Sequence, residues 1–167
     1  MEEYSFDKIQ DKISKLSARD PTTKAFTLVL DLDETLIHYD EQNSHLWVRP
    51  YLDHFVHELK EYFNIVIFTA SIQEYADIII NFLDQEKIHF KEKFYRKHLT
   101  TLPNGQLSKN LNVIHPDLSK ILIVDNTPEN FQEQQENGIW IKSWYGDQND
   151  KSLKKLIELL KNMVISG

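Results

Sequence analysis

The sequence predicts an α/β fold in which helices flank a central parallel sheet. Four short runs are apolar and rich in β-branched residues, at 26–31, 64–69, 120–125 and 138–142. They are apolar on both faces, as buried parallel strands are. Segments with helical spacing of apolar residues alternate with these runs, which is the order expected when helices cover a parallel sheet. The length of 167 residues fits one domain, and 41% hydrophobic residues argue against extensive disorder.

The first 24 residues form a separate segment in this prediction. Their apolar side chains fall roughly on one helical stripe: Tyr4, Phe6, Ile9, Ile13 and Leu16. This spacing predicts a short amphipathic helix over 4–17, which either packs on the body or stays a mobile arm. Pro21 ends the stripe. We therefore expect a helical arm over 1–24 and a single domain over 25–167.

Three further segments carry helix or hairpin signals. A helix is expected over 50–63, with Pro50 in its first turn, and another from Ser71 to about Gln85, with Ser71 as its N-cap in a capping box. A closing helix is expected over 152–164. The basic and aromatic stretch 88–108 contains a Pro-Asn-Gly turn at 103–105 that predicts a hairpin. The link 37–48 is expected to be little more than a turn beside Trp47.

Charge and composition exclude several classes of function. The net charge of −7 disfavours sequence-independent nucleic-acid binding, which needs an excess of Lys and Arg. Without cysteine there is no disulfide, no zinc–thiolate site and no thiol nucleophile. The apolar runs are too short to span a bilayer, and the acidic N-terminus is no secretory signal. We expect an intracellular monomer, nuclear or cytoplasmic, with no direct nucleic-acid or membrane partner.

Polar side chains gather where three of the apolar runs end, in Asp31-Leu32-Asp33, in Thr69-Ala70-Ser71 and in Asp125-Asn126. Ligands bind beyond the carboxyl ends of parallel strands. Paired carboxylates repel one another, and Mg²⁺ relieves the repulsion because it prefers oxygen ligands. These residues therefore predict a magnesium site, although each Asp or Asn alone could be a turn former or helix cap.

The same residues belong to an ordered series of motifs. Asp31, Asp33 and Thr35 form a DxDxT sequence, and Phe68–Ser71, Lys109–Leu111, Ile123–Pro128 and Lys142–Tyr145 follow in order. The series resembles the haloacid-dehalogenase superfamily over residues 25–162. Within it, the series is similar to the phosphatases of the polymerase II C-terminal-domain type, also called NLI-interacting-factor-like. This resemblance implies a Rossmann-like sheet with a minimal cap.

The resemblance also implies a role for each matching residue. Asp31 corresponds to the nucleophile that forms an aspartyl-phosphate, and Asp33 to the general acid and base. Thr69 and Lys109 correspond to the groups that bind the phosphoryl oxygens. A metal set of Asp31, Asp33, Asp125 and Asn126 is implied as well, in which Asp33 uses its backbone carbonyl.

Other residues have less certain counterparts in the family. Arg49 and Arg96 could guide a substrate, or they could simply pair with surface acids or remain solvated. Thr35 is expected to hold the loop that aims the two aspartates. The segment 37–48 is shorter than the family's usual insertion, and Asn110 stands where the family often has Asp. These departures concern substrate selection rather than catalysis.

The function expected from these observations is a Mg²⁺-dependent phosphatase for phosphoserine or phosphothreonine in a protein or peptide. The polymerase II tail is one candidate substrate. Three alternatives remain open: a catalytically silent interaction module of the mitochondrial-translocase-subunit type, a small-molecule phosphatase, and a glycosyltransferase DxD site. The last does not explain Thr69 or Lys109.

Overall fold

A computed structural model describes residue 24 and residues 26–166, with side chains up to residue 162. The predicted helix over 4–17 lies outside the described residues. Within the described part of the chain, no helix is long and apolar enough to cross a membrane.

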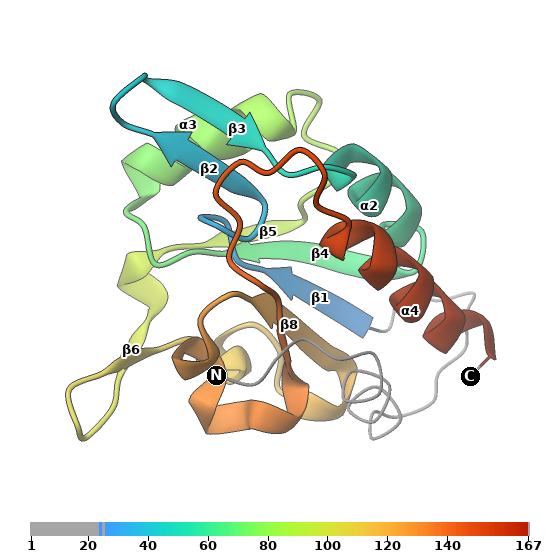
Figure 1. The fold of residues 1–167 in the computed structure, drawn as a ribbon. Helices are drawn as coiled ribbons and strands as arrows, with labels where there is room; N and C mark the ends of the chain where they lie inside the picture. The colour runs from blue at the N-terminus through green and yellow to red at the C-terminus, as the bar shows by residue number, and fades with distance from the viewer. Residues whose placement is uncertain (1–23, 25, 167) are drawn as a thin grey trace.

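The central sheet is parallel, as the sequence predicts, and it has five strands where four were predicted (Figure 1). In spatial order they are β5 (Glu92–Phe94), β4 (Phe63–Phe68), β1 (Phe26–Leu30), β8 (Ile121–Asp125) and β9 (Gly138–Trp140). Every residue of the central strand β1 is buried. The edge strand β5 was not predicted, because it has only three residues and two of them are charged.

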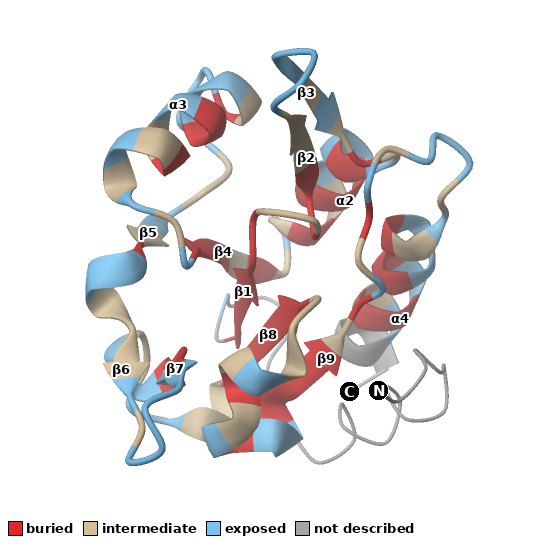
Figure 2. Cartoon of the chain, turned by 60° about the vertical axis from the view of Figure 1, so that its left-hand side comes forward, coloured by how far each residue is buried: buried red, intermediate tan, exposed pale blue. Residues whose placement is uncertain are grey.

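The two faces of the sheet are covered differently (Figure 2). Leu28 and Leu30 of β1 face a large core shared with α2 (Leu52–Leu59), α3 (Gln73–Leu83) and α4 (Ser152–Ser166). Val29 faces a smaller core on the other side. The smaller core is covered by 3₁₀ turns: η1 (Arg96–His98), η2 (Leu111–Val113), η3 (Leu118–Lys120) and η4 (Pro128–Asn137). Alternation along the strand thus divides the apolar side chains between two layers.

Helix α2 is shorter than the predicted helix over 50–63. It begins after Tyr51, whose φ of 71° is left-handed, so Pro50 lies outside the helix. It ends at Leu59, and Phe63 already belongs to β4. The helical spacing of apolar residues therefore continues past the end of the helix: Phe55 and Leu59 belong to α2, whereas Phe63 belongs to β4. The helix predicted over 152–164 is confirmed as α4, which packs beside α2 (Figure 1).

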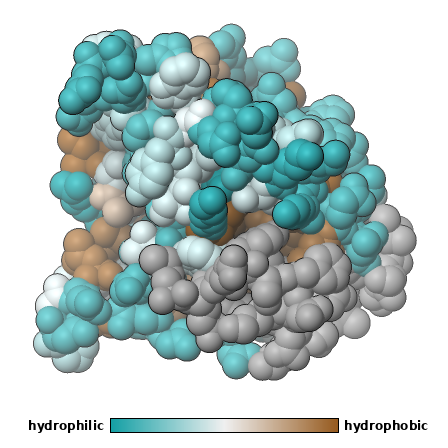
Figure 3. All heavy atoms as spheres, in the orientation of Figure 1, coloured by the Kyte–Doolittle hydropathy of each residue, from teal (hydrophilic) through white to brown (hydrophobic). Residues whose placement is uncertain are grey.

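Helix α3 starts later than predicted, and the predicted capping box is wrong. Ile72 occupies the N-cap position and no side chain caps the helix. Ser71 instead uses its hydroxyl elsewhere, as described below. Hydrophobic patches gather over the side of the molecule that carries α3 and β6 (Figure 3). Ile78 and Phe82 are the exposed apolar residues of α3 itself.

Two antiparallel hairpins complete the fold. The predicted turn at 103–105 is confirmed between β6 (Thr100–Thr101) and β7 (Leu107–Ser108), where Gly105 adopts φ 85°. The expectation of a bare turn over 37–48 is wrong, because β2 (Ile37–Asp40) pairs with β3 (His45–Val48). Asp40 accepts hydrogen bonds from the N–H groups of Gln42 and Asn43 and so forms the turn. The chain therefore carries a small two-stranded sheet directly after its DxDxT motif.

Candidate active site

The carboxyl ends of β4, β1 and β8 bring the predicted site residues to one edge of the sheet. Asp31 directly follows β1, Thr69 directly follows β4, and Asp125 is the last residue of β8. These strands are neighbours in the order β4-β1-β8. Parallel pairing therefore places the three polar strand ends together, as ligand sites in α/β sheets require.

Lys109 connects two of the carboxylates. Its Nζ lies 2.8 Å from Asp31 Oδ1 and 2.7 Å from Asp125 Oδ2. The side chains of Lys109 and Asp125 are fully buried, and Asp31 is nearly so. Burial alone would lower the pKa of Lys109, but the charges of Asp125 and Asp31 outweigh it and raise that pKa. The ammonium is therefore held in its charged form between two carboxylates.

Asp125 is the fully buried carboxylate of the site. Its own burial and the charge of Asp31 raise its pKa to about 7, although Lys109 acts in the opposite direction. Both carboxylate oxygens accept hydrogen bonds from Asn130 Nδ2, at 3.2 and 3.1 Å, and Oδ1 also accepts from Thr127 N–H. The carboxylate is thus fixed in orientation while its charge is only partly compensated.

Thr35 and Asn126 continue this network. The buried Thr35 hydroxyl lies 2.8 Å from Asp31 Oδ2 and 3.2 Å from Asn126 Oδ1. Asn126 in turn donates from Nδ2 to Ser143 Oγ at 2.9 Å. Thr35 therefore holds the second oxygen of Asp31, while Lys109 holds the first.

Asp33 is held by a separate pair of hydroxyl groups. Ser71 Oγ donates to Asp33 Oδ2 at 2.8 Å, and Tyr75 Oη donates to Asp33 Oδ1 at 3.2 Å. Burial raises the pKa of Asp33; the Ser71 hydrogen bond lowers it and the charge of Asp31 raises it again, and the net shift is upward. The Ser71 N–H also donates to Thr69 Oγ1 at 3.1 Å, which occupies a lone pair of that hydroxyl and not its proton. Ser71 therefore links two groups: the Asp33 carboxyl, which retains its proton more readily, and the Thr69 hydroxyl, whose proton remains available for donation.

Arg49 lies in the interior and pairs with an acid, which is the alternative to its predicted role in guiding a substrate. Its Nε and Nη2 donate to the Asp150 carboxylate at 2.8 and 3.2 Å. Its Nη1 and Nη2 also donate to the backbone carbonyls of Thr35 and Lys142, each at 3.0 Å. Only 1% of Arg49 is exposed. This placement favours a structural role, in which Arg49 supports the Thr35 loop from inside.

Arg96 is exposed and lies beside the strand end of β4. Its Nε donates to the Ala70 carbonyl at 2.8 Å, and its N–H donates to the Ser71 carbonyl at 3.0 Å. Both contacts anchor Arg96 next to Thr69, so its predicted role toward a substrate stays a prediction.

The donor set at this edge fits a hard cation. Asp31 and Asp125 share the buried Lys109 ammonium, and the third carboxylate, Asp33, makes no ion pair with it. Burial first, and then the charge of Asp31, raise the pKa of Asp125, and the polar side chains that could act as ligands at this edge are oxygen donors. Among the described residues no three His, Cys, Asp or Glu side chains are grouped as ligands, so a metal here would need backbone and amide oxygens also. The predicted use of the Asp33 carbonyl and Asn126 meets that need.

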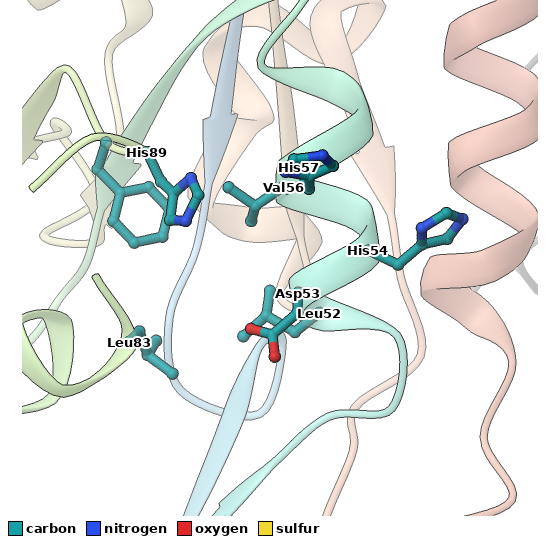
Figure 4. Close-up of a pocket in the computed structure, with 8 residues that line it drawn as sticks. Leu52, Asp53, His54, Val56, His57, Leu83 and His89 are labelled. Carbon is teal, nitrogen blue, oxygen red and sulfur yellow. The ribbon is translucent and has the colours of Figure 1, made fainter. Parts of the chain in front are cut away.

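A pocket of about 330 Å³ lies between α2 and the segment that follows α3 (Figure 4). It is lined in part by His54, His57 and His89, and the view shows His54 pointing away from the other two. Because none of its lining residues belongs to the DxDxT cluster, this pocket is separate from the candidate active site.

The site contains functional residues that the sequence analysis missed. Tyr75 was not singled out, because its contact with Asp33 depends on how α3 lies against the DxDxT loop. Asn130 was missed as well, because its contact with Asp125 depends on the path of η4. No local sequence pattern indicates either contact.

Comparisons with known proteins agree with this geometry. The family model described as NLI interacting factor-like phosphatase matches residues 26–166. The chain is 35% identical over 154 residues to nuclear envelope morphology protein 1 of Schizosaccharomyces pombe, covering 80% of this chain and 32% of that protein. It is 35% identical over 159 residues to CTD nuclear envelope phosphatase 1B of Danio rerio, covering 80% and 64%. The chain thus spans about a third to two thirds of the length of these relatives.

A solved structure shares the fold. The fission yeast RNA polymerase II CTD phosphatase Fcp1, bound to beryllium fluoride, superposes with a TM-score of 0.59 at 16% identity. The match covers 86% of this chain and 52% of that one. At this identity the likeness concerns architecture alone, and it confirms the predicted haloacid-dehalogenase-type fold. The family match over nearly the whole domain shows that this chain belongs to the NLI interacting factor-like phosphatases.

Proposed function

We propose that this chain hydrolyses phosphoserine and phosphothreonine in proteins through an aspartyl-phosphate on Asp31. The single observation that carries the proposal is the fixed Asp31 carboxylate, with Lys109 on one oxygen and Thr35 on the other. A carboxylate held in one orientation loses little freedom when it attacks phosphorus. Family membership supports the reaction class.

In the first step an Asp31 oxygen forms a bond to phosphorus while the bond to the serine or threonine oxygen breaks. The departing alkoxide is a poor leaving group, and Asp33 gives it a proton. In the second step water attacks the aspartyl-phosphate, Asp33 takes the proton from that water, and Asp31 is released with inorganic phosphate. The raised pKa of Asp33, caused first by burial, suits a group that must donate a proton before it accepts one.

Thr69 and Lys109 would bind the phosphoryl oxygens. Lys109 has three N–H donors, of which two reach carboxylates, so one remains for the substrate. Asp31, the Asp33 carbonyl, Asp125 and Asn126 would hold Mg²⁺. Bound there, the ion would offset the repulsion between the carboxylates and the negative phosphoryl group.

The substrate class is inferred from how little of the described part of the chain covers the site. The β2–β3 hairpin is the element that follows the DxDxT loop, and it is only partly buried. A site without a large cap accepts a polypeptide more readily than it encloses a metabolite. Arg96, exposed beside Thr69, would contact an acidic or phosphorylated part of such a peptide. The names of the relatives favour a nuclear-associated location and a phosphoprotein substrate.

The test is hydrolysis of an aryl phosphate and of a phosphoserine peptide, each with Mg²⁺ and with EDTA. We expect wild type to cleave both substrates only with Mg²⁺, and Asp31→Asn to cleave neither. Asp53→Asn, an exposed aspartate on α2, is the matched control and keeps wild-type rates. Hydrolysis that survives in Asp31→Asn would refute the mechanism. A folded wild type without activity on either substrate would favour an interaction module instead.

A further inference from the structure

A groove of about 820 Å³ lies on the β8–β9 side of the site. One wall comes from η4 and the residues just before it, including Asn126, Glu129 and Gln135. The other wall comes from Trp140, the last residue of β9, and from Ser143 and Tyr145 in the segment that follows. Both walls begin at carboxyl ends of strands, so the groove opens at the same edge of the sheet as the cluster around Asp31.

The groove and the active site share residues. Asn126 lines the groove, and its Oδ1 lies 3.2 Å from the same Thr35 hydroxyl that contacts Asp31. Ser143, also in the groove wall, accepts a hydrogen bond from Asn126. A polypeptide whose phosphorylated residue reaches Asp31 would therefore have its neighbouring residues within reach of this groove.

Tyr145 lies at the boundary between the groove and the candidate active site. Its ring packs edge-on against His38 of β2, with ring centroids 5.4 Å apart, and His38 Nδ1 lies 2.9 Å from Glu34 in the DxDxT loop. Tyr145 is nevertheless 68% exposed. An exposed aromatic ring at the boundary of a catalytic site offers a flat apolar surface to a passing peptide.

The chemistry of the walls selects what can bind. Trp140 and Pro128 supply apolar surface, and Gln132 and Gln135 supply amide donors and acceptors of the kind that pair with peptide backbone. Among the described residues that line the groove, Glu129 alone carries a charge at neutral pH. The groove is therefore suited to neutral or basic residues and unfavourable to acidic ones.

We propose that this groove is a subsite for the residues on one side of the phosphorylated residue, and that it favours a basic side chain and rejects an acidic or second phosphorylated one. The proposal rests on the proposed function, since it concerns the same substrate. A volume of about 820 Å³ is in the range of sites that enclose a small ligand, so a short peptide segment fits.

The test measures kcat/KM for phosphoserine peptides that differ only in one flanking residue, Lys or Glu, placed before or after the phosphoserine. Each value is divided by that of an aryl phosphate, which has no flanking residue. We expect wild type to prefer Lys over Glu about fivefold on one side of the phosphoserine only, as one exposed charge pair provides. Glu129→Lys reverses this preference.

Two further variants sharpen the result. Tyr145→Ala lowers kcat/KM for the peptides relative to the aryl phosphate, chiefly by raising KM. Glu61→Lys, an equal charge change at an exposed residue just after α2, keeps the wild-type preference. A flank preference that Glu129→Lys leaves intact would overturn the subsite, and so would the absence of any preference in an active enzyme. If folded wild type shows no hydrolysis that depends on Asp31, the proposed function itself is overturned.

Discussion

Replacing Arg49 with methionine is expected to destabilise the protein strongly while leaving substrate binding intact in the molecules that fold. The guanidinium makes four hydrogen bonds: two to the Asp150 carboxylate and one each to the carbonyls of Thr35 and Lys142. Methionine keeps the apolar stem and much of the volume but removes every donor. Asp150, only 11% exposed, then lies without its counter-charge.

The magnitude follows from that burial. Removing one partner of a buried ion pair costs about 3–5 kcal/mol, because the other charge remains desolvated. For a domain of this size, each kcal/mol shifts the melting temperature by roughly 2–4 °C. The Arg49→Met protein should therefore melt about 6–20 °C below wild type. Lys161→Met is the control, since it breaks the ion pair with Glu58 in which both side chains are about a third exposed, and its melting temperature should change little.

The effect should also depend on pH. Burial alone would raise the pKa of Asp150, but the hydrogen bond and charge of Arg49 hold it below the ordinary value. A carboxyl with a depressed folded-state pKa stabilises the protein above its unfolded pKa of about 4, and this contribution is lost as the pH falls through the folded value. Without Arg49, burial raises the pKa of Asp150 above its ordinary value, so the stability difference between wild type and Arg49→Met should begin to shrink above about pH 4 and continue to shrink until the pH has fallen through the depressed wild-type value.

The assay is thermal and urea unfolding of both proteins from pH 3 to pH 7, with steady-state hydrolysis of the phosphoserine peptide at a temperature where both are folded. An unchanged melting temperature together with a raised KM would refute the reasoning, because Arg49 would then act on the substrate and not on the fold.

Three other outcomes follow from the described contacts. Tyr75→Phe removes a donor to Asp33, so it should slow hydrolysis of the phosphoserine peptide about tenfold and that of an aryl phosphate much less, because only the alkoxide needs the acid; equal slowing would contradict this. Gly138→Ala should lower the yield of folded protein, since its Cβ would lie 2.0 Å from the Phe131 ring; adding Phe131→Ala should restore part of the yield. Mg²⁺ should raise the wild-type melting temperature by mass action, and raise it less in Asp125→Asn; equal increments would argue against Asp125 as a ligand.

The sequence predicts the central strands well because burial on both faces leaves a direct signal in β1, β4 and β8. It does not reveal β5, since an edge strand of three residues can be polar and still pair with β4. The β2–β3 hairpin was missed for a related reason. Its strands are short and mostly half-exposed, so no continuous apolar run announces them.

The candidate site was predictable where chemistry follows directly from strand ends, as at Asp31 and Asp125. It was not predictable where a contact joins distant parts of the chain. Ser71 satisfied a local rule for helix caps, but Asp33 uses its hydroxyl instead. The burial of Arg49 depends on Asp150, which is 101 residues further along the chain, and no local pattern indicates such a partner.

The contacts of Lys109 have a consequence for how the candidate site forms during folding. Lys109 and Asp31 are 78 residues apart in the sequence, and Arg49 and Asp150 are 101 apart. Contacts of such long range form only after large loops have closed, which is the slow part of folding. A nascent or partly unfolded chain can therefore hold all of its local helices while Asp31 still lacks its contact with Lys109. The candidate site is complete only when the whole topology has formed, and no fragment that separates β1 from β8 retains the arrangement.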